Sequence, residues 1–430
     1  MPTTTYGNLI RTNRNFRLFW GGQIVSQLGD WFNMIAVQSL LLQYTGKSGS
    51  IAGFMVAAML PHLVLGPVAG VIVDRYPRRT VMIVTDLARA GIALGLLGFR
   101  GPDTAWVAYA CVAGLACFAA VFEPARIATL PNITADHELL TANALSAVTW
   151  SILLTSGALV GGLVARFCGA DTAFVLNSLS FAGSALFLWR MEAPRVQSAP
   201  AGPGATSGFG AIREGLHYVL RDRELSAALT AKLGWGLAGG VQTLLPVFGQ
   251  RLFPLPGDRG GQLSLSLLMA AGGLGTALGP ILARRITGQE IAKIRWAIAV
   301  SFLLGGLYLG IVSAAQSLGW VAGFLFLSRM HGSIVWVFST VLLQMQTEDR
   351  YRGRVFAAEG SLFTLGMMIS NVLTAAALDQ GLFPVSTLTL ILGSVSLLVG
   401  VGWVIRAARS GQRSTGNPPV VAPRAQKDSR

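Results

Sequence analysis

The chain alternates between long apolar runs and short polar segments. Twelve runs are candidates for membrane helices, at residues 18–42, 49–73, 80–99, 105–127, 141–165, 172–190, 226–249, 262–283, 296–314, 319–343, 357–378 and 384–405. Most of them reach the ~20 residues that an α-helix needs to cross ~30 Å of hydrocarbon. The pattern therefore predicts an all-α membrane protein with twelve transmembrane helices.

Composition agrees with this interpretation. Of the 430 residues, 52% are hydrophobic and only 12% are charged, whereas soluble proteins carry about 25% charged residues. Residues 1–17 are polar, and we expect a short basic tail rather than a cleavable signal peptide, because the first apolar run is long enough to span. The net charge of +14 does not indicate a nucleic-acid partner, because the cations gather in segments between the spans.

The distribution of Lys and Arg predicts the orientation. Of the 33 cations, 25 fall in segments on the side of the N-terminus, five fall on the other side, and three lie within the spans. Because cytoplasmic loops are enriched in Lys and Arg, we expect both termini in the cytoplasm. Residue 258 should then be accessible from outside.

Two short motifs repeat at one spacing. Leu65-Gly66-Pro67 recurs as Leu278-Gly279-Pro280, and Thr134-x-Asp136 recurs as Thr347-x-Asp349, both after 213 residues. Each pair also occupies a corresponding place among the predicted spans. We therefore expect two pseudo-symmetric bundles of six helices each.

The polar segments divide the chain into four parts. Residues 1–194 form the first bundle, 195–225 a cytoplasmic linker, 226–410 the second bundle, and 411–430 a tail rich in Pro, Ser and Arg that we expect to be disordered. Within the linker, apolar residues from Phe209 to Leu220 recur at helical spacing, which predicts an amphipathic helix at the membrane surface.

A charged turn separates the second and third spans. It comprises Gly70, Asp74, Arg75, Arg78 and Arg79, with Pro77 ending the preceding helix. This pattern resembles the loop motif between helices 2 and 3 of the major facilitator superfamily, although that family has Gly where this chain has Pro77. The resemblance implies the major facilitator fold and a secondary transporter.

A second charged pair lies at the inner end of the fourth span, where Glu123 and Arg126 are three residues apart. In the resembled family, charges at this place meet the loop motif in a cytoplasmic latch. That latch holds the outward-open state and breaks on switching. The resemblance therefore assigns Glu123 and Arg126 to gating.

Further motifs resemble the bacterial branch that includes enterobactin and macrolide exporters, which implies a location in a bacterial inner membrane. They are Asn15 to Trp20, Leu28 to Phe32, Pro124 to Arg126, Leu140 to Leu145 and Arg352 to Phe356. In the fifth span, Gly157, Gly161 and Gly162 resemble the antiporter signature of the family, with Ala158 in place of its Pro. That signature implies export; generic close packing of small residues is the alternative.

Asp30 and Arg329 are the acid and the base that we place nearest the membrane midplane. Asp30 is twelve residues into the first span, a depth of about 18 Å at 1.5 Å per residue. A carboxyl group at this depth can serve as the proton carrier of a coupled transporter; a structural carboxylate is the alternative. Arg329 lies in the tenth span, and in the resembled family helices 1 and 10 both line the central cavity. The sequence leaves open whether the two side chains meet.

Other polar residues in the spans favour structural roles. Asp86 and Arg89 are three residues apart and share a helix face, which predicts a structural ion pair. Lys232 lies about 9 Å from the inner end of its span and should snorkel to the surface; a cavity cation is the alternative. His331 is expected to be a core residue bonded to a hydroxyl group. Cys111, Cys117 and Cys168 fit no disulfide framework or metal site.

These observations favour a proton antiporter that exports a small apolar or amphipathic molecule, such as a drug, siderophore or secondary metabolite, by alternating access. An importer or symporter, and a non-transporting sensor or assembly protein, remain alternatives. The expected partners are substrate, protons and lipid, and the protein should act as a monomer. No GxxxxGK[ST] motif occurs, so ATP-driven transport by this chain alone has no support. No nucleophile, base and orienting group stand at a suggestive spacing, and we expect no enzyme activity, no cofactor and no metal.

Overall fold

The structure is a computed structural model of the chain, and it describes residues 5–192, 209–258, 260–288 and 290–414. Over these ranges the chain is almost entirely helical and contains no β-strand. The sequence-predicted linker from Ser198 to Gly208 lies outside the described residues, as does the tail beyond Ser414.

The first half of the chain forms seven helices. They are α1 (Tyr6–Thr12), α2 (Arg14–Thr45), α3 (Gly49–Arg75), α4 (Arg78–Gly95), α5 (Ala105–Ile133), α6 (Asp136–Phe167) and α7 (Ala170–Arg190), with the short turns η1 (Leu96–Gly98) and η2 (Pro102–Thr104) before α5. The expected N-terminal tail thus contains a helix, because Leu9 of α1 is fully buried in the core of this half.

The second half begins with α8 (Phe209–Arg221), where the sequence predicts an amphipathic helix. The remaining elements are α9 (Arg223–Leu237), α10 (Val241–Val247), the turn η3 (Phe248–Leu252), α11 (Gln262–Thr287), α12 (Ile291–Val312), α13 (Leu318–Gln346), α14 (Asp349–Asp379) and α15 (Val385–Ser414). Because α15 continues to Ser414, the C-terminal tail begins later than the predicted residue 411.

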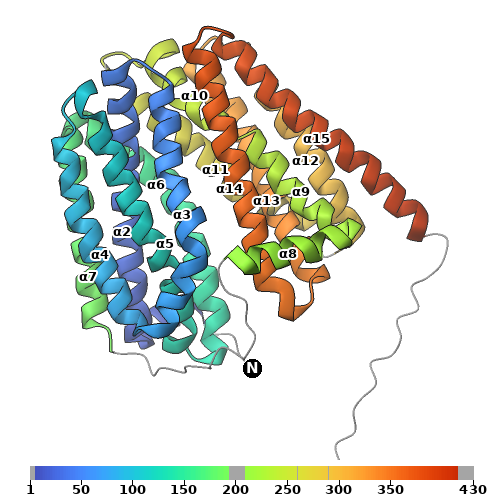
Figure 1. The fold of residues 1–430 in the computed structure, drawn as a ribbon, viewed down its shortest axis with the longest axis horizontal. Helices are drawn as coiled ribbons and strands as arrows, with labels where there is room; N and C mark the ends of the chain where they lie inside the picture. The colour runs from blue at the N-terminus through green and yellow to red at the C-terminus, as the bar shows by residue number, and fades with distance from the viewer. Residues whose placement is uncertain (1–4, 193–208, 259, 289, 415–430) are drawn as a thin grey trace, which may run out of the picture.

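The two halves form two helix bundles that stand side by side, and α8 lies across the end where the N-terminus is found (Figure 1). Ten of the described helices are long and apolar enough to cross a membrane. The first predicted span corresponds to α2, which is long but rich in polar residues. The predicted span 226–249 is broken into α9 and α10 at Gly239 and Gly240. The architecture is consistent with twelve crossings.

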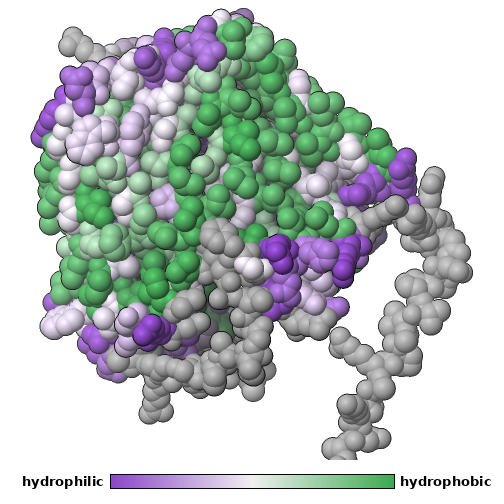
Figure 2. All heavy atoms as spheres, in the orientation of Figure 1, coloured by the Kyte–Doolittle hydropathy of each residue, from purple (hydrophilic) through white to green (hydrophobic). Residues whose placement is uncertain are grey.

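The surface carries a broad apolar belt with polar residues at both ends (Figure 2). Many large apolar side chains are exposed on the helices; Leu179, Trp189, Leu373 and Leu398 are each at least 60% exposed. Exposed apolar surface on this scale is rare on soluble monomers, and it indicates that these helix faces contact lipid.

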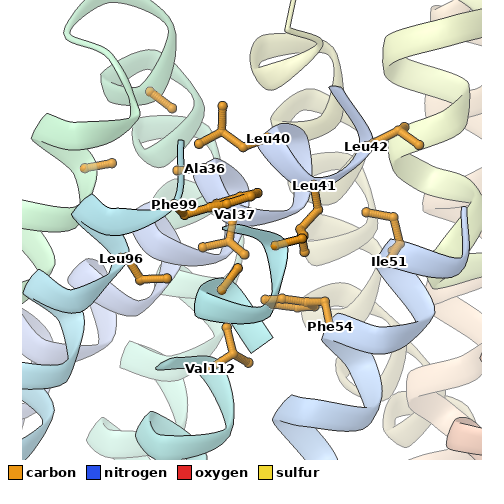
Figure 3. Packing of buried hydrophobic residues seen from close by; sticks show 14 of the residues in the cluster. Ala36, Val37, Leu40, Leu41, Leu42, Ile51, Phe54, Leu96, Phe99 and Val112 are labelled. Carbon is orange, nitrogen blue, oxygen red and sulfur yellow. The ribbon is translucent and has the colours of Figure 1, made fainter. Parts of the chain in front are cut away.

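Apolar packing also joins the bundles at the end opposite the termini. Val37, Leu41, Phe54 and Phe99 belong to a buried cluster there (Figure 3), which Val247 of α10 joins from the second bundle. In a second cluster, Ile35 of α2 packs among residues of α10, α11 and α13. These contacts bring the bundles together at this end and help to enclose the cavity described next.

Candidate functional site

A cavity of about 410 Å³ lies between the two bundles. Helices α2, α3, α4, α5 and α6 supply one wall, and α10, α11 and α13 supply the other. Most of its lining is apolar. The polar and charged lining residues are Asp30, Asn33, Gln38, His62, Arg89, Gln242, Thr276 and Arg329.

Asp30 and Arg329 both line this cavity, as the resemblance to a family whose helices 1 and 10 line the central cavity implied. Asp30 is on α2 of the first bundle, and Arg329 is on α13 of the second. Among the described residues neither side chain forms a hydrogen bond or an ion pair, so an Asp30–Arg329 pair is not formed in this conformation. The cavity thus contains an acid and a base without partners in the described part of the chain.

Glycines beside these charges set their positions. A Cβ at Gly29 would lie 2.6 Å from Asn177 Oδ1, so α2 packs tightly on α7 just before Asp30. A Cβ at Gly272 of α11 would lie 3.3 Å from Arg329 Cγ, so the missing side chain leaves room for the Arg329 stem. Therefore α2 packs closely on α7 beside Asp30, and α11 packs closely on α13 beside Arg329.

The Asp86–Arg89 pair forms as the sequence predicts. Arg89 donates a hydrogen bond to Asp86 Oδ1, and the two side chains are only 6% and 0% exposed. The Arg89 guanidinium also lies 4.4 Å from the ring centroids of both Phe122 and Phe181, within the range of cation–π contacts. Arg89 reaches the cavity wall, but Asp86 neutralises its charge.

The glycines of α6 contact two other helices. A Cβ at Gly157 would lie 2.5 Å from Trp31 Cδ1, and one at Gly161 would lie 3.0 Å from the Trp31 carbonyl oxygen. On the same helix, a Cβ at Gly162 would lie 2.9 Å from the carbonyl oxygen of Gln262, which begins α11. The motif therefore packs α6 against the residue after Asp30 and against the opposite bundle.

The charged turn between α3 and α4 contacts backbone carbonyl groups. Arg78 Nη1 donates to the Ala128 carbonyl of α5 at 2.7 Å, and Arg79 Nε donates to the Leu188 carbonyl of α7 at 2.9 Å. Tyr76 is extended, with φ −116° and ψ 153°, because a residue before proline avoids the helical region. The turn thus fixes α4 to α5 and α7.

The remaining members of the predicted latch are placed as follows. Glu123 and Arg126 form an ion pair of 2.9 Å within α5, and Arg75 is exposed. Gly70 lies on α3 with open space around its Cα. The side chain of Asp74 lies outside the described part of the structure, so its contacts are not described.

Lys232 is placed differently from the snorkelling side chain that its sequence position favoured. Its Nζ lies 2.9 Å from Glu359 Oε1 on α14, donates to Thr340 Oγ1 at 2.8 Å, and lies 3.9 Å from the ring centroid of Trp336. Both charged side chains are at most 5% exposed. A buried partner on another helix holds Lys232 inside the bundle, so the prediction of snorkelling was wrong.

Polar contacts close the bundle interface at the end opposite the termini. The backbone N–H groups of Ser48 and Gly49, which begin α3, donate to the Asp379 carboxylate of α14 at 2.7 and 2.6 Å. A carboxylate at a helix N-terminus is favoured because it satisfies free N–H groups and opposes the helix dipole. Arg251 also donates to the Gly46 carbonyl group across the interface.

Residue 258 lies at this same end but is not accessible. Asp258 is 2% exposed, accepts hydrogen bonds from Ser264 and lies 3.5 Å from Arg166 Nη1 of the first bundle. Our expectation that it could be labelled from outside was wrong, because its carboxylate is part of the closed interface.

Several polar residues of the site were missed in the sequence. Gln38 is fully buried, and neither its amide oxygen nor its nitrogen has a partner among the described residues; the Asn33 carbonyl oxygen is also unpartnered there. Gln38 is eight residues after Asp30, about two helical turns, and this spacing could have indicated a shared face. His62 opens to the cavity from α3, with Nδ1 3.1 Å from the Ala58 carbonyl oxygen.

Residues expected to be structural have structural surroundings. His331 is 8% exposed, and its Nδ1 lies 2.8 Å from the Leu327 carbonyl oxygen rather than from a hydroxyl group. The three cysteines are free. In the described part of the chain, no group of three His, Cys, Asp or Glu side chains could hold a metal ion.

Comparison with known proteins places this architecture in a family. The model of the Major Facilitator Superfamily matches residues 19–371. The MFS-type transporter YfiS of Bacillus subtilis (strain 168) is 25% identical, over 91% of this chain and 93% of its own. The putative bacilysin exporter BacE of Bacillus amyloliquefaciens is 26% identical over 86% of this chain and 91% of its own. Macrolide efflux protein A of Streptococcus pyogenes is 24% identical over 85% of this chain and 89% of its own.

Solved structures share the fold. A mutant of the nucleoside transporter NupG superposes with a TM-score of 0.70 at 13% identity, covering 91% of this chain and 99% of its own. A bacterial homologue of the iron transporter ferroportin, in its inward-facing state, gives a TM-score of 0.66 at 15% identity, with coverages of 91% and 98%. The chain therefore belongs to the Major Facilitator Superfamily and is a multi-pass membrane transporter.

Proposed function

We propose that this transporter is an exporter of small amphipathic molecules that uses proton antiport. The observation that carries the proposal is the placement of Asp30, a carboxyl group without a partner among the described residues, on the wall of the cavity between the bundles. A group in this place can take up a proton or contact cargo. Ionisable residues inside a membrane commonly mark ion and substrate pathways.

The contacts of the two bundles support alternating access. The end opposite the termini is held closed by Asp379 at the start of α3 and by buried apolar clusters. With both termini cytoplasmic, as the cation distribution favours, this conformation is closed to the outside. Glu123 and Arg126 pair within α5, at the cytoplasmic end where the resembled family has its latch.

Export is the favoured direction because some relatives are named exporters, BacE and macrolide efflux protein A among them. The glycines of α6 add support, since they occupy the place of the antiporter signature. In this proposal Asp30 carries the proton, Arg329 faces it across the cavity, and Gly157, Gly161 and Gly162 allow α6 to move against α2 and α11.

Everted membrane vesicles from a bacterial host test the proposal. Such vesicles turn the cytoplasmic face outward, so an exporter accumulates cargo inside them. We expect an acidic interior to drive uptake of some members of a panel of amphipathic dyes, antibiotics and short peptides, and an uncoupler to abolish it. Accumulation in right-side-out vesicles instead would support the importer alternative and contradict export.

A further inference from the structure

The cavity contains more polar groups than proton exchange requires. The Gln38 side chain is completely buried, and its amide oxygen and nitrogen both lack a partner among the described residues. The Asn33 side chain is 6% exposed, and its carbonyl oxygen is also unpartnered there. Both residues line the cavity on α2. Buried polar groups without hydrogen bonds are costly, and two of them beside one cavity point to a bound molecule with polar groups of its own.

The charges of the cavity wall balance. Asp30 supplies one negative charge from the first bundle, and Arg329 supplies one positive charge from the second. Arg89 also reaches the wall, but its ion pair with Asp86 cancels its charge. A molecule with net charge would leave one wall charge uncompensated, whereas a molecule with one charge of each sign would satisfy both.

From this arrangement we propose that the cargo is a small zwitterion with amide groups, that is, a short peptide or peptide-like molecule. Its ammonium group binds Asp30 and its carboxylate binds Arg329. Its amide groups hydrogen-bond Gln38 and Asn33, whose buried side chains turn towards the cavity to meet them. An arginine suits this role because its planar guanidinium can donate two parallel hydrogen bonds to a carboxylate. This inference rests on the proposed transport function and specifies the cargo of the same cavity.

The rest of the lining suits the side chains of such a molecule. Trp31, Phe54, Met55 and Leu268 supply apolar surface around the polar groups. A volume of about 410 Å³ lies within the range of roughly 300–1,000 Å³ found for small-molecule sites. The cavity therefore accepts a cargo that is zwitterionic along its backbone and apolar in its side chains.

The proposal also links cargo to coupling. An ammonium group and a proton both neutralise the Asp30 carboxylate, so the two cannot occupy it together. Release of the peptide on one side would then free Asp30 to take up a proton there. Competition of this kind predicts that acidic pH weakens peptide binding. The other titratable or charged groups on the cavity wall are His62 of α3, Arg89 of α4 and Arg329 of α13.

Equilibrium binding to the full-length protein in detergent tests the cargo class without transport. The probe is the dipeptide Ala-Phe, compared with its N-acetyl form and its C-terminal amide. We expect each blocked form to bind at least tenfold more weakly than the free dipeptide. Equal binding of the three forms, or no binding of Ala-Phe, would overturn the zwitterion proposal. Proton-driven uptake of an amphipathic dye would still support the proposed transport function.

Two substitutions assign the contacts, and a third serves as the control. Arg329→Gln should remove most of the preference for the free carboxylate over the amide while retaining the preference for the free amine. Gln38→Leu should weaken the binding of all three probes about tenfold. Arg285→Gln, an exposed cation at the end of α11, is the matched control and should change nothing. Arg329→Gln with an unchanged preference for the carboxylate would overturn the assigned contact, and a thermal melt like that of wild type confirms that each variant is folded.

Discussion

Asp30 and Arg329 show how far single residues can be interpreted from sequence. Their depth predicted a position near the midplane, the resemblance to a known family implied a shared cavity, and the structure places both residues on the wall of one cavity. The sequence did not predict Glu359 as the partner of Lys232, because the two residues are far apart along the chain and helix periodicity carries no information on contacts between helices. Gln38 was missed because a glutamine within a span resembles an ordinary packing residue.

The guanidinium group of Arg329 should matter beyond its charge. Arg329→Lys keeps the positive charge but loses the planar fork. If the fork grips a carboxylate, we expect Arg329→Lys to reduce peptide transport nearly as much as Arg329→Ala, about tenfold or more. Initial transport rates in vesicles with matched expression measure this. A nearly normal rate for Arg329→Lys would show that charge alone suffices.

The Lys232–Glu359 pair should be required for stability. Lys232→Met would leave Glu359 buried without its cation, and breaking a buried pair in this way typically costs about 3–5 kcal/mol. The double variant Lys232→Met with Glu359→Leu removes both charges and should recover most of that loss. Thermal unfolding in detergent ranks the stability of wild type, the single variant and the double variant. A single variant as stable as wild type would contradict the buried pair.

At the scale of elements, the sequence predicted the helices better than their breaks. The end of α3 and the start of α4 follow from Pro77, and α5 and α11 follow from the length of their apolar runs. The break between α9 and α10 was missed because Gly239 and Gly240 lie inside an otherwise continuous apolar run. A Cβ at Gly240 would lie 2.9 Å from the Ser370 carbonyl oxygen of α14. This close contact depends on a distant helix, which the local pattern cannot show.

The contact between α6 and α2 should be sensitive to a single methyl group. Gly157→Ala places a Cβ 2.5 Å from Trp31 Cδ1, so the indole next to Asp30 must move. We expect transport to fall severalfold while the protein remains in the membrane. Gly183→Ala on α7 is the matched control, because its Cβ would lie 3.6 Å from Val25, an ordinary contact. Equal transport by both variants would contradict a role for the α6 glycine in positioning Trp31.

The contact between Asp379 and α3 should stabilise the closure opposite the termini. Asp379→Ala removes a carboxylate that accepts two backbone N–H groups across the bundle interface. We expect the population to shift towards the conformation that is open at that end, as seen by faster alkylation of a cysteine placed at Thr276, which lines the cavity outside the apolar clusters. Transport should slow as well, since one step of the cycle loses stabilisation.

Asp171→Ala is the control for this experiment. Asp171 forms a comparable ion pair with Arg100 at 2.7 Å, but both residues belong to the first bundle. Its loss should leave the alkylation rate unchanged. Equal rates for Asp379→Ala and wild type would show that the apolar clusters alone hold this end closed.

At the scale of the whole molecule, the repeat and the run lengths predicted two bundles of helices, and the matching family confirms the fold. The conformational state could not be predicted, since one sequence encodes every state of an alternating-access cycle. The closed end is shown only by the structure, in which the backbone N–H groups of Ser48 and Gly49 donate to Asp379 across the interface.

The orientation in the membrane is a further prediction at this scale. Tags at the N-terminus, at residue 205 and at the C-terminus should all be protected in intact cells, because the cation bias favours cytoplasmic termini. Cysteines at Pro256 and Gln316, which are exposed at the other end, should react with an impermeant reagent from outside. Protection at both positions would invert the proposed orientation and hence the assignment of the closed end.

The central claim is that Asp30 couples cargo movement to protons, and uphill transport by Asp30→Asn tests it most directly. Purified protein is reconstituted in liposomes with an imposed pH gradient and with the cargo that wild type transports best. The account predicts that Asp30→Asn loses uphill transport but retains downhill exchange, because the amide resembles a protonated carboxyl group. The control Asp103→Asn, an exposed acid between α4 and α5, should behave as wild type. Uphill transport by Asp30→Asn at the wild-type rate would contradict the account and make Asp30 a structural residue.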